Sequence, residues 1–96
     1  MVQQASEMMS SLVRLRLIRY YRSTPGSQAD AAAALDVPPT SLTTNLRALV
    51  DIGVLIQEPP TRGRAYTYRV DEARVAALLN SADRYLLRED DSNESE

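Results

Sequence analysis

The pattern of apolar and polar positions divides the first half of the chain into helices. Over residues 8–22 (MMSSLVRLRLIRYYR), apolar residues recur every three or four positions with arginines between them, which predicts an amphipathic helix. We expect residues 1–7 to be a flexible N-terminus. The segment STPGS then ends the helix, because Pro25 and Gly26 form a turn dipeptide.

Residues 27–35 (SQADAAAAL) predict a second, short helix. Ser27 is a favourable N-cap, and Asp30 follows three residues later, as in a capping box. Four consecutive alanines give the segment a high helix propensity. We expect Ala31, Ala34 and Leu35 to face inward.

A third helix is predicted over about 39–52. The sequence DVPP (36–39) ends the preceding helix, because a residue before proline is disfavoured in the α region, whereas proline is well tolerated in a first helical turn. Gly53 then stands where glycine commonly ends a helix. Two helices joined by three or four residues are typical of a helix-turn-helix motif. The apolar stripe of the third helix consists of Leu42, Leu46, Leu49 and either Val50 or Ile52.

After Gly53 the spacing of apolar residues no longer follows the period of a helix. Residues 54–60 (VLIQEPP) and 65–70 (AYTYRV) predict two strands of a hairpin, with Gly63 at the tip of the basic loop between them. We expect Tyr66 and Tyr68 to pack the hairpin against the helices.

Asp71 is the expected N-cap of a final helix over 72–88. A chain of this length does not need so long an apolar stripe at its end unless a partner covers it. We therefore predict a homodimer formed through the first and last helices, the alternative being that the last helix covers the core of its own chain. The predicted dimer interface comprises Leu12, Val75, Leu78, Leu79, Ala82, Tyr85 and Leu86.

Composition excludes most catalytic chemistry. The 96 residues include no cysteine and no histidine, so disulfides, Cys/His zinc sites, cysteine nucleophiles and histidine bases are all excluded. The acidic residues are not clustered at a spacing that favours a metal site. We therefore predict that the chain is not an enzyme and binds no metal or cofactor.

Charge is distributed unevenly along the chain. The net charge is −2, but residues 89–96 (EDDSNESE) carry five acidic residues and no basic one. Residues 1–88 hold 11 arginines against 8 acidic residues, a net charge of +3. A mildly basic domain, 8–88, is thus followed by an acidic tail that we expect to be disordered. The tail either promotes solubility or competes with a polyanion for the basic face.

No apolar run approaches the roughly 20 residues that cross a membrane, and the start of the chain has no basic segment before an apolar one. These features predict a cytoplasmic protein with no membrane partner.

Three segments carry a family resemblance: RLRLIRYY at 14–21, ADAAAALDVPPTSLTTNLRALVDIGVL at 29–55 and RGRAYTYRV at 62–70. Over about residues 10–88 the chain resembles winged helix-turn-helix regulators, and those of the arsenic-repressor (ArsR) type most closely. The resemblance implies a mainly α fold with a small β-hairpin wing (α+β), in the order helix–helix–helix–strand–strand–helix. It also implies a single double-stranded DNA-binding domain.

In that family the helix after the turn enters the major groove, and the wing approaches the minor groove. The resemblance therefore implies that helix 39–52 reads bases, with Asn45 able to pair with adenine and Thr methyl groups able to pack on thymine. The wing, 59–65, would bring arginines to a narrow minor groove. The implied DNA-binding residues are Thr40, Ser41, Thr43, Thr44, Asn45, Arg47, Arg62, Gly63 and Arg64.

The chain also departs from the family. Thr44 stands where a basic residue would be expected, and thiolate metal sensing is excluded because there is no cysteine. The prediction is a dimeric, sequence-specific transcriptional regulator that acts as a repressor. Two alternatives stay open: a winged-helix protein-interaction module, and an architectural or accessory DNA-binding protein of a mobile element.

Overall fold

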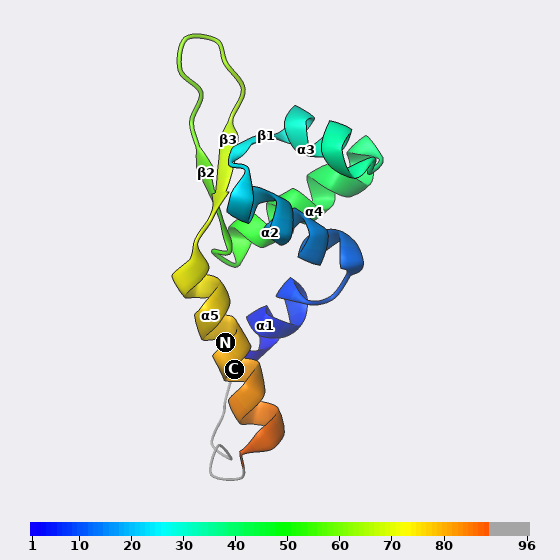
Figure 1. Cartoon of the computed structure of the whole chain (residues 1–96). Helices are drawn as coiled ribbons and strands as arrows, with labels where there is room; N and C mark the ends of the chain where they lie inside the picture. The colour runs from blue at the N-terminus through cyan, green and yellow to red at the C-terminus, as the bar shows by residue number, and fades with distance from the viewer. Residues whose placement is uncertain (89–96) are drawn as a thin grey trace.

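A computed structural model describes residues 1–88; the predicted acidic tail, 89–96, lies outside the described residues (Figure 1). The elements are α1 (Val2–Met8), α2 (Leu12–Ser23), β1 (Gly26–Ser27), α3 (Gln28–Leu35), α4 (Pro39–Asp51), β2 (Leu55–Glu58), β3 (Thr67–Val70) and α5 (Glu72–Leu87). The predicted fold class, mainly helical with a small β-hairpin, is confirmed.

Helix α4 joins the core through the predicted stripe. Leu42, Leu46 and Leu49 are all buried and pack with Leu17 and Tyr21 of α2. Gly53 ends the helix region with a φ of +85°, a conformation that glycine adopts without strain. The prediction of this helix from its apolar period is therefore confirmed.

The sheet connects the hairpin to the helices. Its strand order is β1-β3-β2, and both pairings are antiparallel. Tyr68 of β3 is buried, with its ring centre 5.7 Å from that of Tyr21, as predicted. Tyr66 is instead 48% exposed, because strand pairing ends at Thr67 and the alternation of faces does not continue into the loop.

Tyr21 ties the end of α2 to the start of α3. Its hydroxyl donates a 2.7 Å hydrogen bond to the carbonyl of Ser27 in β1. Burial, with a smaller contribution from nearby Tyr68, raises the pKa of the Tyr21 phenol well above its ordinary value. Strand β1 was not predicted, because a strand of two residues has no periodic pattern.

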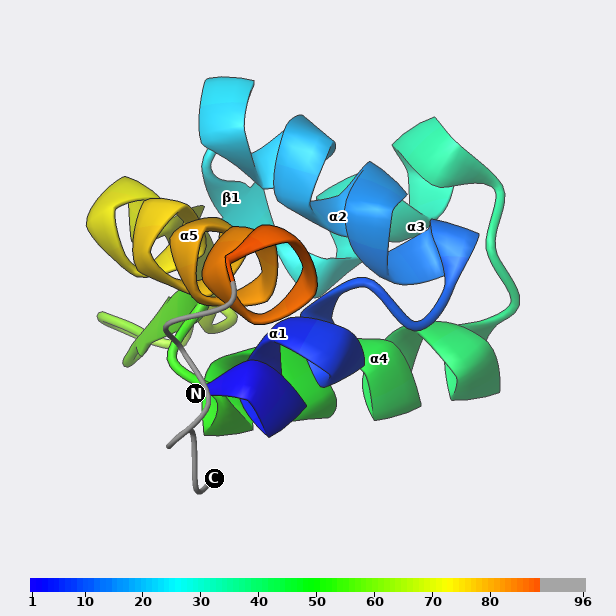
Figure 2. The same cartoon turned by 90° about the horizontal axis from the view of Figure 1, so that it is seen from below.

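The start of the chain differs from prediction. Instead of a flexible segment over 1–7 and one helix over 8–22, there are two helices with a break at residues 9–11. Ser11 caps α2 by accepting a hydrogen bond from the Arg14 amide, which starts a new helix there. Helix α1 buries Ala5 and Met8 and lies beside α5 (Figure 2). A seven-residue helix depends on such packing, which local sequence does not reveal.

Two predictions need correction, one of an inward-facing residue and one of an interface residue. In α3, Ala34 is exposed, whereas Ala31 is buried and Ala32 and Leu35 pack against the core. A run of four alanines has no period from which the buried face could be chosen. In α5, Leu78 is 0% exposed within a single chain, because α1 covers it, so it is not part of a free dimer interface.

The start of α3 provides a stability test. The Ser27 hydroxyl accepts from the Asp30 amide, and the Asp30 carboxylate accepts from the Ser27 amide, both at 3.1 Å. We expect Ser27→Ala to lower the free energy of unfolding by about 1 kcal/mol, because one donor loses its partner. Urea unfolding followed by circular dichroism measures this, with Ser23→Ala as the matched control at an exposed helix end. Equal effects of the two substitutions would contradict the capping role.

Candidate nucleic-acid interface

Helix α4 presents a polar stripe opposite its buried leucines. Thr40, Thr43, Thr44 and Arg47 are exposed and follow the three-to-four spacing of one helix face. Asp51 continues the same face one turn later. The structure thus brings together four of the six α4 residues for which the resemblance implied DNA contact.

The start of α4 is rigid and uncapped by side chains. Asp36 adopts a left-handed conformation with a φ of 54°, Val37 is buried, and Pro38 is the N-cap. No side chain hydrogen bonds to the first turn. Amide groups at such a helix start favour an anion, and Thr40 lies beside them.

Asn45 and Ser41 lie at the half-buried edge of the stripe and bond to each other and to α2. The Asn45 Oδ1 accepts a 2.8 Å hydrogen bond from the Arg14 Nε, and its Nδ2 donates at 2.8 Å to the Ser41 carbonyl. Both ends of the amide are therefore engaged within the chain. This geometry does not favour the adenine contact that the resemblance implied for Asn45.

Gln28 belongs to the same surface but was not predicted. It is the first residue of α3, and its Nε2 donates a 2.8 Å hydrogen bond to the Thr43 Oγ1. The contact crosses the turn between the two helices. The only signal in the sequence is the position directly after the N-cap, which does not show where the side chain reaches.

A polar cleft of about 370 Å³ joins the stripe to the sheet. Thr43 and Arg47 form its α4 side, and Gln57 and Tyr68 form its β-strand side, where the Gln57 Nε2 donates to the Tyr68 hydroxyl at 3.0 Å. The polar stripe of α4 and the base of the hairpin therefore line one cleft.

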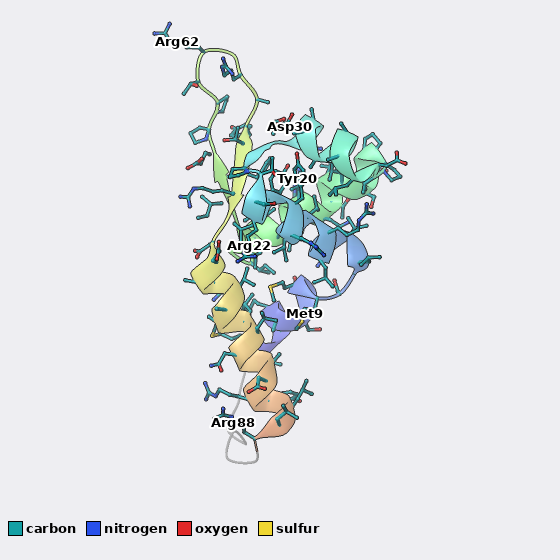
Figure 3. All side chains as sticks on the ribbon, viewed as in Figure 1. Met9, Tyr20, Arg22, Asp30, Arg62 and Arg88 are labelled. Carbon is teal, nitrogen blue, oxygen red and sulfur yellow. The ribbon has the colours of Figure 1, made fainter. Side chains whose placement is uncertain are left out.

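The loop between β2 and β3 has a tight turn at its tip. The Arg64 amide donates to the Thr61 carbonyl at 3.1 Å, and Arg62 and Gly63 have φ values of 51° and 79°. Positive φ at both central residues is the pattern of a type I′ turn. Arginine at the first of these positions is strained relative to Asn, Asp or Gly. Arg62 extends from the tip into solvent (Figure 3).

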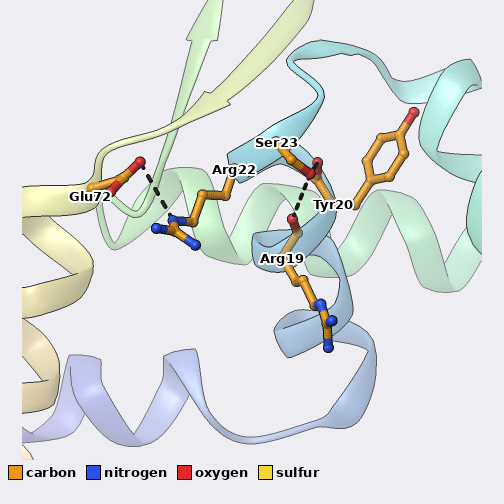
Figure 4. Close-up of polar contacts among 5 residues, drawn as sticks. All are labelled: Arg19, Tyr20, Arg22, Ser23 and Glu72. Carbon is orange, nitrogen blue, oxygen red and sulfur yellow. Dashed lines mark hydrogen bonds and ion pairs between the residues drawn. The ribbon is translucent and has the colours of Figure 1, made fainter.

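Guanidinium groups without a partner gather mainly at this surface. Among residues 1–88, the side chains of Arg19, Arg47, Arg62 and Arg64 form no hydrogen bond or ion pair. Three of these four belong to α4 or the wing. Outside α4 and the wing, the arginines other than Arg19 have partners, as Arg22 has in Glu72 at 3.5 Å (Figure 4).

A separate surface is apolar. Of the predicted interface residues, Leu12, Leu79, Tyr85 and Leu86 are exposed, whereas Val75 and Ala82 are half-buried against the core. Three exposed apolar residues were not predicted to belong to this surface: Met9, Leu15 and Leu87. We call the seven exposed residues the apolar face.

Two other findings bear on function. Within residues 1–88, no three acidic, cysteine or histidine residues lie together as a metal site would require. None of the described helices has the length and apolarity needed to cross a membrane.

Comparisons with known proteins support the fold. No family model matches the chain, and no curated protein matches it. It is similar to a solved structure, the crystal structure of a possible transcriptional regulator for arsenical resistance. The fold is a winged helix-turn-helix. The two chains match over the full length of both, with a TM-score of 0.67 and 22% sequence identity.

Proposed function

We propose that this chain is a dimeric transcriptional regulator that binds specific double-stranded DNA, with α4 in the major groove and the wing, 59–65, at the minor groove. One observation carries the proposal: the polar stripe of α4 and the wing hold three arginines, Arg47, Arg62 and Arg64, whose side chains have no partner within residues 1–88. Arginines without an internal partner are available for phosphates. The similarity to a possible transcriptional regulator supports the same function.

Base reading falls to the hydroxyl-bearing residues of α4. The major groove is wide enough to admit a helix, and the exposed Thr44 side chain forms no hydrogen bond with the rest of the described chain that it would have to give up. Thr43 is held by Gln28 at 2.8 Å, which fixes both side chains before binding. Arg47 and the uncapped start of α4 contact the phosphates.

The wing supplies positive charge beyond the end of the hairpin strands. Arg62 and Arg64 flank Gly63 at the tip, and narrow minor grooves attract arginine. A strained conformation is tolerated at Arg62, which favours a function for its side chain.

The apolar face supports a homodimer. Leu12 and Leu86 are 70% and 74% exposed, and Met9, Leu15 and Leu79 line one groove. Exposed apolar patches of this kind mark interaction sites. A two-fold dimer would place two copies of α4 on half-sites about 34 Å apart. Repression by occlusion of a promoter is the simplest outcome, in the cytoplasm and on the nucleoid. Sensing of arsenic through thiolates is not possible, because the chain has no cysteine.

Selection of random double-stranded DNA by the purified chain at near-physiological salt tests the proposal. We expect an inverted repeat with half-sites one helical turn apart. No enrichment, together with no salt-dependent binding, would refute the proposal and favour a winged helix whose partner is a protein. Tandem arrays of enriched sites would instead favour an architectural protein.

Thr44→Ala should relax the preference at one base-pair position, because the methyl and hydroxyl contact is lost. Discrimination at one position is typically worth about 1–3 kcal/mol. Binding to operators with single changes measures it, and Thr24→Ala, at an exposed position at the end of α2, is the control. A uniform loss on all operators would argue against base reading by Thr44.

Arg62→Asn should weaken DNA binding without destabilising the fold, since Asn tolerates a positive φ better than Arg. We expect the slope of log affinity against log salt to fall by about one unit for a lost phosphate contact. Arg69→Gln is the control, because Arg69 is paired with Glu58 on the same hairpin at 3.0 Å. An unchanged affinity and slope for Arg62→Asn would remove the wing tip from the interface.

Leu79→Glu should convert a dimer to a monomer at micromolar concentration, because a charge would be buried in the apolar face. Sedimentation velocity measures the mass. Asn80→Glu adds the same charge at the next exposed position and should leave the dimer intact. A dimer that survives Leu79→Glu would place the interface elsewhere.

A further inference from the structure

Arg14 joins three helices, and we propose that it is a positioning residue that sets the orientation of α4 for DNA binding. Through Arg14, the packing of α1 against α5 would be linked to the orientation of α4. Because α5 carries part of the apolar face, the proposed dimer interface would be linked to α4 as well. This inference rests on the proposed function, because it assumes that α4 reads DNA.

The contacts of Arg14 are short and reach two elements beyond its own. Its Nε donates to the Asn45 Oδ1 of α4 at 2.8 Å, and its Nη1 donates to the Glu7 carbonyl of α1 at 2.7 Å. Hydrogen bonds from a charged donor are shorter and stronger than those between neutral groups. One side chain thus holds both helices from a position in the first turn of α2.

The α4 end of the contact extends along the helix. The Asn45 Nδ2 donates to the Ser41 carbonyl at 2.8 Å and lies 3.3 Å from the Ser41 Oγ. The amide is therefore oriented by α4 itself, with Oδ1 directed toward Arg14. Rotation of α4 about its axis would move Oδ1 away from the guanidinium, so the bond fixes the direction of the neighbouring stripe, Thr43 and Thr44.

The α1 end of the contact reaches the scaffold. Glu7 lies in the last turn of α1, and its carbonyl also accepts from the Ser10 Oγ at 2.9 Å. The helix is anchored through Ala5 and Met8, which are buried and join Leu78 of α5 in the core cluster. The position of α1 therefore depends on α5, which carries half of the proposed dimer interface.

The chemistry of Arg14 fits a positioning function better than a phosphate contact. It is half-buried, and no carboxylate lies within ion-pair distance of it among the described residues. Two nitrogens of a planar guanidinium meet two neutral oxygens on different helices. Lysine would keep the charge, but its single ammonium group lacks the planar arrangement of donors that reaches both oxygens.

The test compares Arg14→Gln and Arg14→Lys with Arg19→Gln, a control on the same helix whose guanidinium has no internal partner. Each full-length variant is titrated with the selected operator over a series of salt concentrations. We expect both Arg14 variants to lose about tenfold in affinity, as expected for one net charge-assisted bond, with the salt slope unchanged. Arg19→Gln should change the affinity much less.

A salt slope that falls by about one unit in Arg14→Gln but not in Arg14→Lys, which keeps the charge, would mean a direct phosphate contact and overturn the positioning function. Unchanged affinity would also overturn it. A double-mutant cycle with Asn45→Ala tests whether Arg14 acts on DNA binding through Asn45. Arg14→Gln should cost little further affinity once Asn45 is changed, and additive losses would refute the link.

Hydrogen exchange separates failure of this inference from failure of the proposed function. If the wild-type chain binds no DNA, the proposed function fails, but the link remains measurable in the free protein. We expect Arg14→Lys to speed amide exchange in both α4 and the last turn of α1, with α3 unchanged. Amide exchange that rises in neither α4 nor α1, or rises equally in every helix, would refute the link through Arg14.

Discussion

The burial of one leucine stripe on α4 determines where every DNA contact proposed for that helix lies. Leu42, Leu46 and Leu49 lie in the core with Leu17 and Tyr21 of α2, and each buried leucine contributes roughly 1.5–3 kcal/mol of transfer free energy. Because residues three and four apart share a helix face, this burial turns Thr40, Thr43, Thr44 and Arg47 outward together. Rotating α4 to present other residues would expose the leucines. The candidate interface is therefore a consequence of the core: apolar burial sets which face of α4 turns outward, and the function proposed for the Arg14–Asn45 hydrogen bond is to hold α4 in that orientation.

The remainder of the structure supports that helix with a small core. The chain has no Phe or Trp, so Tyr21 and Tyr68 provide the large rings that join α2 to the sheet. Their packing holds β3 against the helices and thus determines where the hairpin leaves the domain. The end of the molecule opposite the wing is less enclosed. Helix α5 extends away from the wing (Figure 1), and Leu86 and Leu87 near its end are about three-quarters exposed. A core this limited and an apolar face this open together favour association with a second copy.

The elements with a clear period were predictable from sequence, and those without one were not. The stripe of α4, the capping box at Ser27 and the positive φ at Gly53 follow from local rules, and each is found in the structure. Part of the candidate site was predictable for the same reason, because the positions of the buried leucines determine which threonines are exposed. Gln28 and the engagement of Asn45 were not predictable, because they depend on contacts between residues 15 and 31 positions apart. Helix α1 and the two-residue β1 likewise exist through tertiary packing and pairing.

The arginines divide into groups whose partners explain their positions. Arg14, Arg16 and Arg74 donate to the carbonyls of Glu7, Leu35 and Ile52, at the C-terminal ends of α1, α3 and α4. Cations are favourable there because the last carbonyls of a helix lack intrahelical partners and carry a partial negative charge. These three arginines therefore serve the fold, and the planar guanidinium suits a carbonyl on a neighbouring element. Among the described residues, no such carbonyl or carboxylate lies within reach of Arg47, Arg62 or Arg64. A net charge of +3 over residues 1–88 is modest for a DNA-binding domain, but affinity depends on the charges free to meet phosphates. Those charges lie mainly on α4 and the wing, so the small net charge is compatible with binding to DNA.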